Sequence, residues 1–533
     1  MTQATSSVSR GGTWSPLFFT WFRWLWIANA VSNIGTWMQN VGAAWLMATL
    51  PAASPLLVAL VQTATNLPVF LLGVPAGAIA DIVDRRKLLI VAQGSMLGAA
   101  AMLGVLALTG TTGPGTLLLL TFILGLGATM NGPAWLAIMP ELVPSHELPA
   151  AIALNSVGFN LARAIGPALG GAVVAAAGAG GAFVLNAISF VGVMIVLYLW
   201  PREPEHAHVS TESVGTAIWS GMRYVRFAAP LHAVLLRSGG FIISASALWS
   251  LLPLVAKVEL HSESRGFGLL LGCLGVGSIL AALIIVRLRQ MFSSEAIATW
   301  GTVLFGLVSI ALAYLSNFGA VAGVMLLGGM AWMSVNSTLN TAAQTSLPAW
   351  VRARAMAVYL LVFQGAMAVG SVIWGAVANR LGLRTTLLAA GVTLLAAALS
   401  TMHLRLAGLR EFDTRPSLHQ PEPILVLERD HDHGPVLVTV EYRIDPERGR
   451  EFAHAMQAVR RVRRRDGAIR WGLFEESSTP GRYIETFVVE SWAEHLRQHE
   501  RFTISDRESE STAFAFHIGA EPPRVTHWIA AHE

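Results

Sequence analysis

The sequence is dominated by apolar runs, each about as long as a membrane is thick. Crossing the ~30 Å hydrocarbon core of a bilayer takes about 20 apolar residues in a helix. Twelve runs in the chain meet that length. They lie at about 24–48, 57–80, 88–108, 116–137, 151–176, 182–200, 231–256, 266–287, 295–315, 320–345, 355–378 and 385–404. We therefore expect an all-α polytopic membrane protein over this part of the chain.

Charge is scarce and unevenly divided. Only 13% of the 533 residues are charged and 54% are hydrophobic, whereas soluble domains average about 25% charged residues. Up to Arg410 there are 20 basic and 10 acidic residues, which leaves 16 and 22 for the rest of the chain. This composition excludes an ordinary soluble enzyme and indicates a basic membrane body followed by an acidic soluble tail. The excess basic residues lie in loops beside the spans, so they do not indicate nucleic-acid binding.

The order of the spans predicts two related halves. Six spans, a longer polar stretch and six more spans are typical of two six-helix bundles that meet around a central path. The predicted domains are a flexible cytoplasmic N-terminus (1–16), an N-terminal bundle (17–200), a cytoplasmic loop (201–230), a C-terminal bundle (231–405), a Pro-, Asp- and His-rich linker (406–435) and a soluble domain (436–533).

Arginine and lysine are concentrated in alternate connectors. The connectors after spans 2, 6, 8 and 10, together with the chain after span 12, hold twelve of these residues, and the other connectors hold four. Because cytoplasmic loops carry the excess of basic residues, we expect both termini to be cytoplasmic. The single Cys273 lies in an apolar run and excludes a disulfide framework. Nearly all the bases are arginine, a bias of GC-rich bacterial genomes, so we expect a bacterial inner-membrane protein.

The tail changes from helical spans to alternating strands and amphipathic helices. Strand patterns occur at 435–444, 468–476, 482–490 and 524–530, and helical spacing occurs at 446–466 and 491–502. The order β-α-β-β-α-β predicts a ferredoxin-like α+β domain.

The segment that closes span 2 carries a charged motif. It reads Gly77-Ala-Ile-Ala-Asp81-Ile-Val-Asp84-Arg85-Arg86-Lys87 and resembles the loop 2–3 signature of the major facilitator superfamily, G-x3-D-R/K-x-G-R-R/K. Ile82 replaces the usual base and Asp84 the usual glycine. The resemblance implies a conformational latch at one membrane edge, and its members here are Gly77, Asp81, Arg85, Arg86 and Lys87.

Span 5 carries a second motif, made of small residues. Its members Gly158, Gly166, Pro167, Gly170 and Gly171 let helices pack closely and bend the span. The motif is similar to the G-x-x-x-G-P-x-x-G-G signature of exporters in that superfamily. Longer stretches between about residues 17 and 405 resemble the transmembrane secretion effector branch, which includes enterobactin-type siderophore exporters. The resemblance implies alternating-access export of a small amphipathic molecule, such as a siderophore, drug or secondary metabolite.

Polar side chains inside the spans are the candidates for substrate binding, because burying them in lipid is costly. They are Asn33, Trp37, Asn40, Gln62, Asn66, Asn131, Arg163, Trp332, Asn336, Asn340 and Gln364. For a single amide the alternative is an interhelical hydrogen bond, which contributes about 0.6 kcal/mol. The regular stripe on span 10, at Trp332, Asn336, Asn340 and Gln344, favours cavity lining. Arg163, interpreted as the only ionisable residue well inside a span, either snorkels to a carbonyl or binds an anionic group.

No acidic residue is predicted in the middle of a span, which argues against simple proton antiport through a buried carboxylate. We expect no cofactor, metal or catalytic residue. In the tail, His495 with His499, and the arginines between 460 and 465, are predicted to be solvated helix faces. The tail resembles the antibiotic-biosynthesis monooxygenase type of dimeric α+β barrel, which implies self-association through aromatic surface. Two alternatives remain: an importer of the same fold, and a membrane-tethered sensor or enzyme whose active part is the tail.

Overall fold

The computed structural model describes residues 12, 14–201, 222–404, 406, 417 and 434–530. The expectations for the first eleven residues, for most of the loop 201–230 and for most of the linker 406–435 therefore lie outside the described residues. The chain divides into two compact units. The first comprises residues 1–210, 237–338 and 360–403, and the second comprises 211–236, 339–359 and 404–533.

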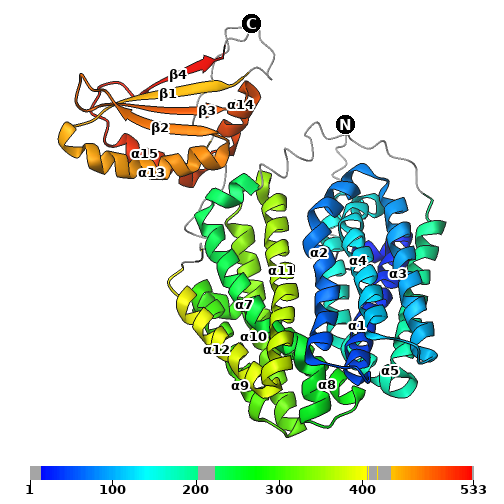
Figure 1. The fold of residues 1–533 in the computed structure, drawn as a ribbon. Coiled ribbons are helices and arrows are strands. Elements are labelled where there is room, and N and C mark those ends of the chain that lie inside the picture. The colour runs from blue at the N-terminus through cyan, green and yellow to red at the C-terminus, as the bar shows by residue number, and fades with distance from the viewer. Residues whose placement is uncertain are drawn as a thin grey trace. The chain divides into compact units, whose positions relative to one another are not determined.

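Long helices make up the membrane body, as the apolar runs predict (Figure 1). They are α1 (Thr20–Thr49), α2 (Pro55–Ile82), α3 (Arg85–Leu108), α4 (Pro114–Leu142), α5 (Leu148–Leu199), α7 (Ala229–Leu254), α8 (Ser264–Met291), α9 (Ser294–Tyr314), α10 (Phe318–Thr345), α11 (Ala349–Leu381) and α12 (Leu383–Thr401). A 3-10 turn (Ser15–Phe18) precedes α1, and a π-helical stretch (Val255–Glu259) continues α7.

The 52-residue α5 is two spans joined at a glycine. Gly178 has φ 69° and ψ 175°, which no helix contains, so the chain reverses there between the predicted fifth and sixth spans. Ten helices of the described part are long and apolar enough to cross a membrane, with α5 counted as one. The more polar α1 supplies the remaining span. The twelve-span prediction is therefore confirmed for the described residues.

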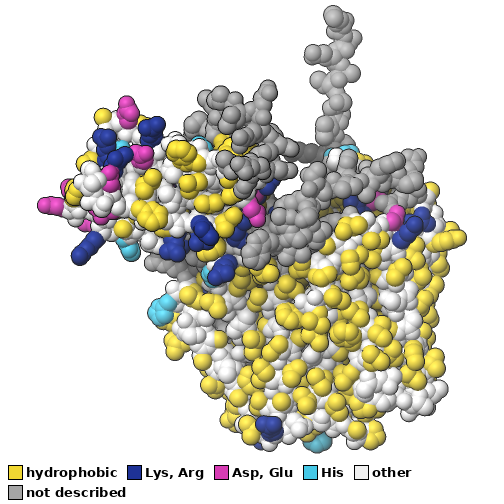
Figure 2. All heavy atoms as spheres, turned by 45° about the horizontal axis from the view of Figure 1, so that its top comes forward, with side chains coloured by type: hydrophobic (Ala, Val, Ile, Leu, Met, Phe, Trp, Pro, Cys, Tyr) yellow, Lys and Arg dark blue, Asp and Glu magenta, His cyan; other side chains and the backbone are white. Residues whose placement is uncertain are grey.

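The helices expose apolar side chains on their outer surface. Figure 2 shows hydrophobic side chains over the helical part in the view drawn, while charged side chains gather on the small C-terminal domain. Val91, Leu283 and Trp300 are each about 70% exposed. A surface of this kind is stable in lipid and not in water, because exposing so much apolar side-chain area to water is unfavourable.

Close crossings join the two halves of the membrane body. A Cβ atom built on Gly171 of α5 would lie 2.8 Å from the Cα of Gly268 in α8, so these two helices touch backbone to backbone. Thr63 of α2 donates a hydrogen bond to the carbonyl of Ala368 in α11 (3.0 Å). Lys257, at the end of α7, donates one to the carbonyl of Ala48 at the end of α1 (2.7 Å).

The C-terminal module, residues 434–530, is a four-stranded antiparallel sheet with helices packed on it. Its elements are β1 (Val436–Arg443), α13 (Gly449–Asp466), β2 (Arg470–Glu475), β3 (Arg482–Val489), α14 (Trp492–Arg501), α15 (Ile504–Phe514) and β4 (Arg524–Ile529), and the strand order is β2-β3-β1-β4. The predicted strand and helix order is confirmed, with α15 as an unpredicted addition.

The two faces of this sheet differ. Alternate residues of β1, among them Val438 and Tyr442, are buried under the helices together with Phe452 of α13. The opposite face carries Phe474 and Trp528, which are 57% and 58% exposed. This face of the sheet therefore presents two large aromatic side chains that the described residues leave uncovered.

Candidate functional site

The first half of α5 contacts a different helix on each of two faces. A Cβ atom on Gly166 would lie 2.6 Å from the Cβ of Trp37, so this face packs on α1. Ala164 and Ala168 face α8, because Cβ atoms built on Gly275 and Gly272 would lie 3.1 Å from the Cα of Ala164 and 3.4 Å from the Cβ of Ala168. The small residues of the exporter-like motif are therefore the ones that allow these approaches.

A third face of α5 is polar. At 100° per residue, Ser156, Asn160 and Arg163 lie between the face on α1 and the face on α8. The reverse side of the helix carries Leu161, Ile165 and Leu169, which are 50%, 39% and 46% exposed, as lipid-facing residues are. Ser156 and Asn160 are also exposed. This polar face, here called the α5 polar face, lies on the other side of the helix from the apolar face of Leu161, Ile165 and Leu169.

Arg163 lies at the middle of its span. Leu148, where α5 begins, and Gly178, where the span ends, are each fifteen residues away, or about 22 Å at 1.5 Å per residue. An arginine side chain cannot reach a membrane surface from there. Arg163 is half-buried, and it has no hydrogen-bond or ion-pair partner among the residues that the structure describes. The interpretation that it pairs with a carbonyl therefore has no support in the structure.

The polar residues predicted on α1 and α2 are partly accessible. Asn33, Trp37 and Asn40 are all half-buried on α1. On α2, Gln62 is half-buried, while Asn66 is buried and donates to the carbonyl of Gln62 (2.6 Å).

Other predicted site residues bind neighbouring helices. Asn131 of α4 accepts a hydrogen bond from Gln93 of α3 (2.9 Å), which is the interhelical role that the sequence left as the alternative. Gln39 of α1 accepts one from Asn186 of α5. That second pair could not be predicted, because a buried amide pair and a cavity amide look alike in one sequence.

The stripe on α10 is divided between packing and exposure. Trp332 is only 4% exposed and packs among the rings of Phe241, Trp249, Phe305 and Phe363. In this structure Trp332 thus belongs to an aromatic core rather than to a cavity wall. Further along α10, Asn336 is half-buried and donates to the carbonyl of Trp332 (2.9 Å), and Asn340 accepts from exposed Gln344 (2.5 Å). Gln364 of α11 is half-buried.

The basic run after α2 ties helices of the N-terminal half together. Arg85 forms an ion pair with Glu141 of α4 (3.0 Å), and Arg86 donates to the carbonyl of Tyr198 at the end of α5 (2.6 Å). Asp84 caps α3 through the amide of Lys87 (2.9 Å). The Gly77 position is open, because a Cβ atom built there would have no other atom within 4 Å. The side chain of Asp81 lies outside the described residues.

A second arginine inside a span was missed by the sequence analysis. Arg237 lies in α7, eight residues from its start, and is 5% exposed. Its Nη1 donates to Thr299 (3.2 Å), and its Nε and Nη2 have no hydrogen-bond partner in the described part of the chain. Arg237 lies near the start of the predicted span 231–256, where the sequence gives no signal that an arginine is buried.

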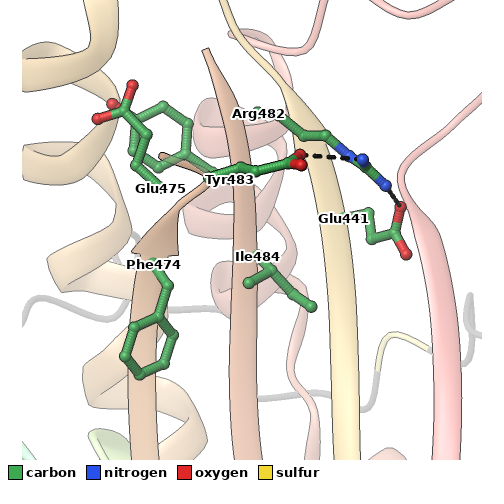
Figure 3. A pocket seen from close by; sticks show the side chains of 7 residues that line it. Glu441, Phe474, Glu475, Arg482, Tyr483 and Ile484 are labelled. Carbon is green, nitrogen blue, oxygen red and sulfur yellow. Dashed lines mark hydrogen bonds and ion pairs between the residues drawn. The ribbon is translucent and has the colours of Figure 1, made fainter. Parts of the chain in front are cut away.

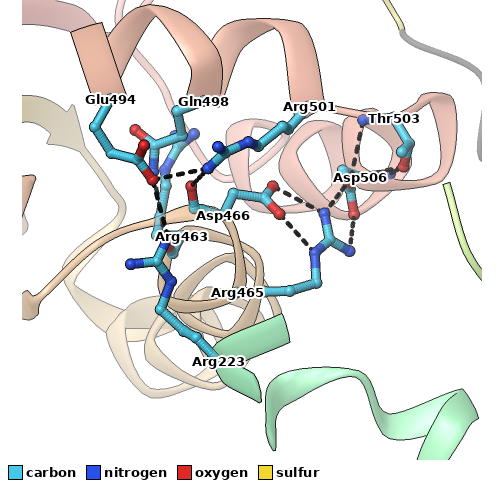
Figure 4. Close-up of polar contacts among 9 residues, drawn as sticks. All are labelled: Arg223, Arg463, Arg465, Asp466, Glu494, Gln498, Arg501, Thr503 and Asp506. Carbon is cyan, nitrogen blue, oxygen red and sulfur yellow. Dashed lines mark hydrogen bonds and ion pairs between the residues drawn. The ribbon is translucent and has the colours of Figure 1, made fainter. Parts of the chain in front are cut away.

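The C-terminal module contains a buried charge network, drawn in Figure 4. Arg465 of α13 binds Asp466 (2.7 Å) and both carboxylate oxygens of Asp506 (3.0 and 2.7 Å). Arg463 binds Glu510 (2.7 Å) and the fully buried Glu485 (3.4 Å). The prediction of a solvated arginine face is wrong for Arg463 and Arg465, because acids on α15 and β3 pair with them.

The same network holds residues that precede α7 and begin α11, all within the second unit. Arg223 donates to Glu494 of α14 (2.9 Å), which also binds Arg501 (2.7 Å). The Arg501 guanidinium lies 4.4 Å from the ring centroid of Trp350, at the start of α11. Trp350 in turn meets Tyr224 edge to face. The module is thus fastened to two segments that lead into membrane helices.

Burial and charge move the pKa values of this network in opposite directions. Burial raises the pKa of Asp466 to about 6, although Arg465 opposes the shift. Burial also raises the pKa of Glu494, but Arg501, Arg497 and Arg223 outweigh it and hold the pKa below its usual value. Glu494 therefore stays ionised while it joins α14 to Arg223.

The histidines of α14 are not a solvated face, so that prediction is wrong for His495. This side chain is 2% exposed and packs against Trp492 and His527. Burial and the neighbouring His499 lower the pKa of His495 to about 3, so it is neutral. Among the described residues, no group of three or more His, Cys, Asp or Glu side chains is arranged to hold a metal ion.

A shallow hollow of about 340 Å³ lies on the open sheet face of the module (Figure 3). Phe474, Ile484 and Tyr483 line it together with Arg482, which pairs with Glu441 (3.2 Å) and Glu476 (2.9 Å). Glu475, the remaining charged residue of the lining, accepts a hydrogen bond from the amide of Gly481 (3.2 Å).

Comparison with known proteins decides the family. Residues 11–533 match the family described as transmembrane secretion effector. The chain belongs to this family. The match runs through the C-terminal module, so the module lies within the region that the family covers.

Relatives and solved structures agree with this assignment. YfiS of Bacillus subtilis, an uncharacterised MFS-type transporter, is 25% identical over 387 residues, which are 70% of this chain and 91% of the relative. The staphyloferrin A transporter of Staphylococcus aureus is 22% identical, over 68% of this chain and 90% of its own. The multidrug efflux pump Tap of Mycobacterium tuberculosis is 25% identical, over 68% and 88%.

The fold is also that of known transporters. A bacterial homologue of the human lysosomal transporter Spinster, in an inward-facing and unoccupied conformation, has a TM-score of 0.59 at 14% identity and covers 72% of this chain and 96% of its own. The protein is thus a multi-pass membrane transporter of the major facilitator superfamily. Its relatives are named as transporters, which points to a non-enzymatic protein.

The neutral His495 predicts that acid destabilises the module. Its folded pKa of about 3 is below the ordinary 6.5, so the stability that neutral His495 gives is full above pH 6.5 and is lost as the pH falls toward 3. The loss is at most about 1.4 kcal/mol per pH unit. We expect His495→Gln to lose less stability than the wild type between pH 7.5 and 5, measured by urea unfolding of the full chain in detergent. The raised pKa of Asp466 makes the folded state more stable as the pH falls. This contribution is the same in the wild type and in His495→Gln, so it cancels when their losses of stability are compared.

His454→Gln is the matched control, because His454 is exposed on the neighbouring α13. It should keep the pH dependence of the wild type. Equal losses in all three proteins would contradict the buried neutral state of His495.

Proposed function

We propose that the protein exports a small amphipathic molecule, such as a siderophore, drug or secondary metabolite, from the bacterial cytoplasm by alternating access. The observation that carries this proposal is the Gly171–Gly268 crossing, where two helices from different halves of a transporter touch without side chains between them. A contact of this kind can separate as the halves rock. The exporter-like motif of α5 and a relative named as an efflux pump support the direction, and a relative named as a staphyloferrin A transporter supports the substrate class.

The charge bias of the loops supports an orientation with both termini in the cytoplasm. The ends of α1 and α7 and the start of α8 then face outward. Ala48, Lys257 and Gly268 make their contacts at that end, which supports a state closed on the outer side. In this state the path would receive its substrate from the cytoplasm. The latch proposed at the inner edge, with Asp81 and the run Arg85–Lys87, would stabilise one state of this cycle.

The C-terminal module has a proposed regulatory role. It is fastened through Glu494 and Arg501 to segments that lead into α7 and α11, so its position would follow their movement. This favours regulation over the alternative of a tethered enzyme. We also propose that the open sheet face with Phe474 and Trp528 mediates self-association, as the resemblance of the module implies.

Export can be measured in cells loaded with a panel of dyes, drugs and iron chelators, compared with cells that carry the empty vector. We expect at least one amphipathic compound to leave faster when the protein is present and a membrane potential or proton gradient is maintained. Faster uptake of such compounds would indicate the importer alternative. Unchanged fluxes across the whole panel, at normal protein level, would contradict a transporter of this substrate class.

The role of the module can be tested in the same assay. Glu494→Gln weakens the pairs with Arg223 and Arg501, so we expect it to change the export rate about as much as ending the chain at Arg410. Glu441→Gln, in an exposed pair with Arg482, should leave the rate unchanged. If all three proteins export like the wild type at equal abundance, the module does not regulate transport.

A further inference from the structure

Arg163 is a charge in the middle of a membrane span, and none of the described residues provides a countercharge. Such a charge is costly to place there, and other cations of the membrane body have found partners. Arg85 binds Glu141, Lys257 binds the carbonyl of Ala48, and Arg289 binds Ser337. Arg163 has none among the described residues. A buried charge without a permanent partner would be stabilised by a group that binds there only for part of the time.

The surroundings of Arg163 suit a bound molecule. Ser156 and Asn160 precede it on the α5 polar face, and both are exposed. Trp37 of α1 packs its Cβ against Gly166, one turn after Arg163. Its ring is half-buried. A guanidinium, an amide and an indole therefore lie within about two turns of each other on adjoining helices.

In the described part of the membrane body, no acidic residue lies near the middle of a span. The ten acidic residues before Glu411 are Asp81, Asp84, Glu141, Glu147, Glu203, Glu205, Glu212, Glu259, Glu263 and Glu295. Those in described helices lie at the ends: Asp81 close to the end of α2, Glu141 at the end of α4 and Glu295 at the start of α9. The middle of the membrane body thus has a positive potential that a substrate anion would neutralise.

We propose that Arg163 binds an anionic group of the transported molecule, a carboxylate, sulfonate or phosphate, while Trp37 contacts its apolar part. A guanidinium matches such groups through paired hydrogen bonds. This proposal rests on the proposed export function, because it names the substrate class of the same path. The site would accept any anionic amphipathic molecule that reaches the path.

The field at this site can be measured without knowing the substrate. In a Cys273→Ser background, Asn160→Cys places a thiol one turn from Arg163. Its reaction rates with the anionic sulfonatoethyl and the cationic trimethylammonioethyl methanethiosulfonates are compared, each relative to 2-mercaptoethanol in solution. With Arg163 present, we expect the anionic reagent to be favoured by tenfold or more. Arg163→Gln should abolish that preference, and Arg163→Lys should keep most of it.

Each outcome is decisive. An equal ratio with Arg163 and with Arg163→Gln, or a thiol at residue 160 that reacts with neither reagent, overturns the proposal. If the Arg163→Gln chain is not produced, the ratio in the protein with Arg163 intact decides alone, since a value near one contradicts a positive site.

The export assay separates this proposal from the proposed function. Arg163→Gln should lower export of anionic compounds at least tenfold and leave uncharged ones unchanged. An equal loss for both classes overturns the anion site but leaves the transporter. A wild-type protein that moves no compound contradicts the proposed function, while the reagent ratio still reports on the site.

Discussion

The cost of placing a polar group in hydrocarbon organises this molecule. This cost favours helices for the segments that cross the membrane, since each helix satisfies its own backbone hydrogen bonds. It also moves charge to the helix ends, where Arg85 meets Glu141 and Arg86 meets the carbonyl of Tyr198. The membrane body therefore has a charged rim and an apolar middle. Arg163 stands out because it breaks this rule without a partner among the described residues.

Lipid supplies no hydrophobic force to hold helices together, so the crossings depend on close contact between small residues. α5 contacts α1 through Gly166 and Gly170 and contacts α8 through Ala164, Ala168 and Gly171. One helix thus joins the two halves and also presents the polar face with Arg163. Arg163 and the contact of Gly171 with α8 lie on the same helix, with Pro167 between them.

The sequence predicted the spans well, because a bilayer of fixed thickness sets their length. The break at Gly178 separates the two spans expected there, and the four strands of the module lie within the predicted runs. α15 was not predicted, because its sequence ISDRESESTAF lacks an apolar period. It forms through the capping box of Thr503 and Asp506, and Asp506 also binds Arg465.

Side-chain surroundings were harder to predict than spans. Helical spacing places Trp332 on a face of α10 but does not tell that four aromatic rings from other helices meet it. Arg463 looked solvated because its acidic partners come from β3 and α15, and His495 looked solvated because His527 comes from β4. Within the candidate path, Arg163 could be located from the sequence. Only the structure shows that it has no partner in the described chain and that it lies between two packed faces of α5.

The central claim is that the two halves meet at the α5–α8 crossing and must separate there during transport. Cβ atoms at residues 168 and 272 would be 3.4 Å apart, close to the spacing of a disulfide. Ala168→Cys with Gly272→Cys, in a Cys273→Ser background, should cross-link on oxidation and stop export, and reduction should restore it. Export that continues at the full rate in the cross-linked protein would contradict this account.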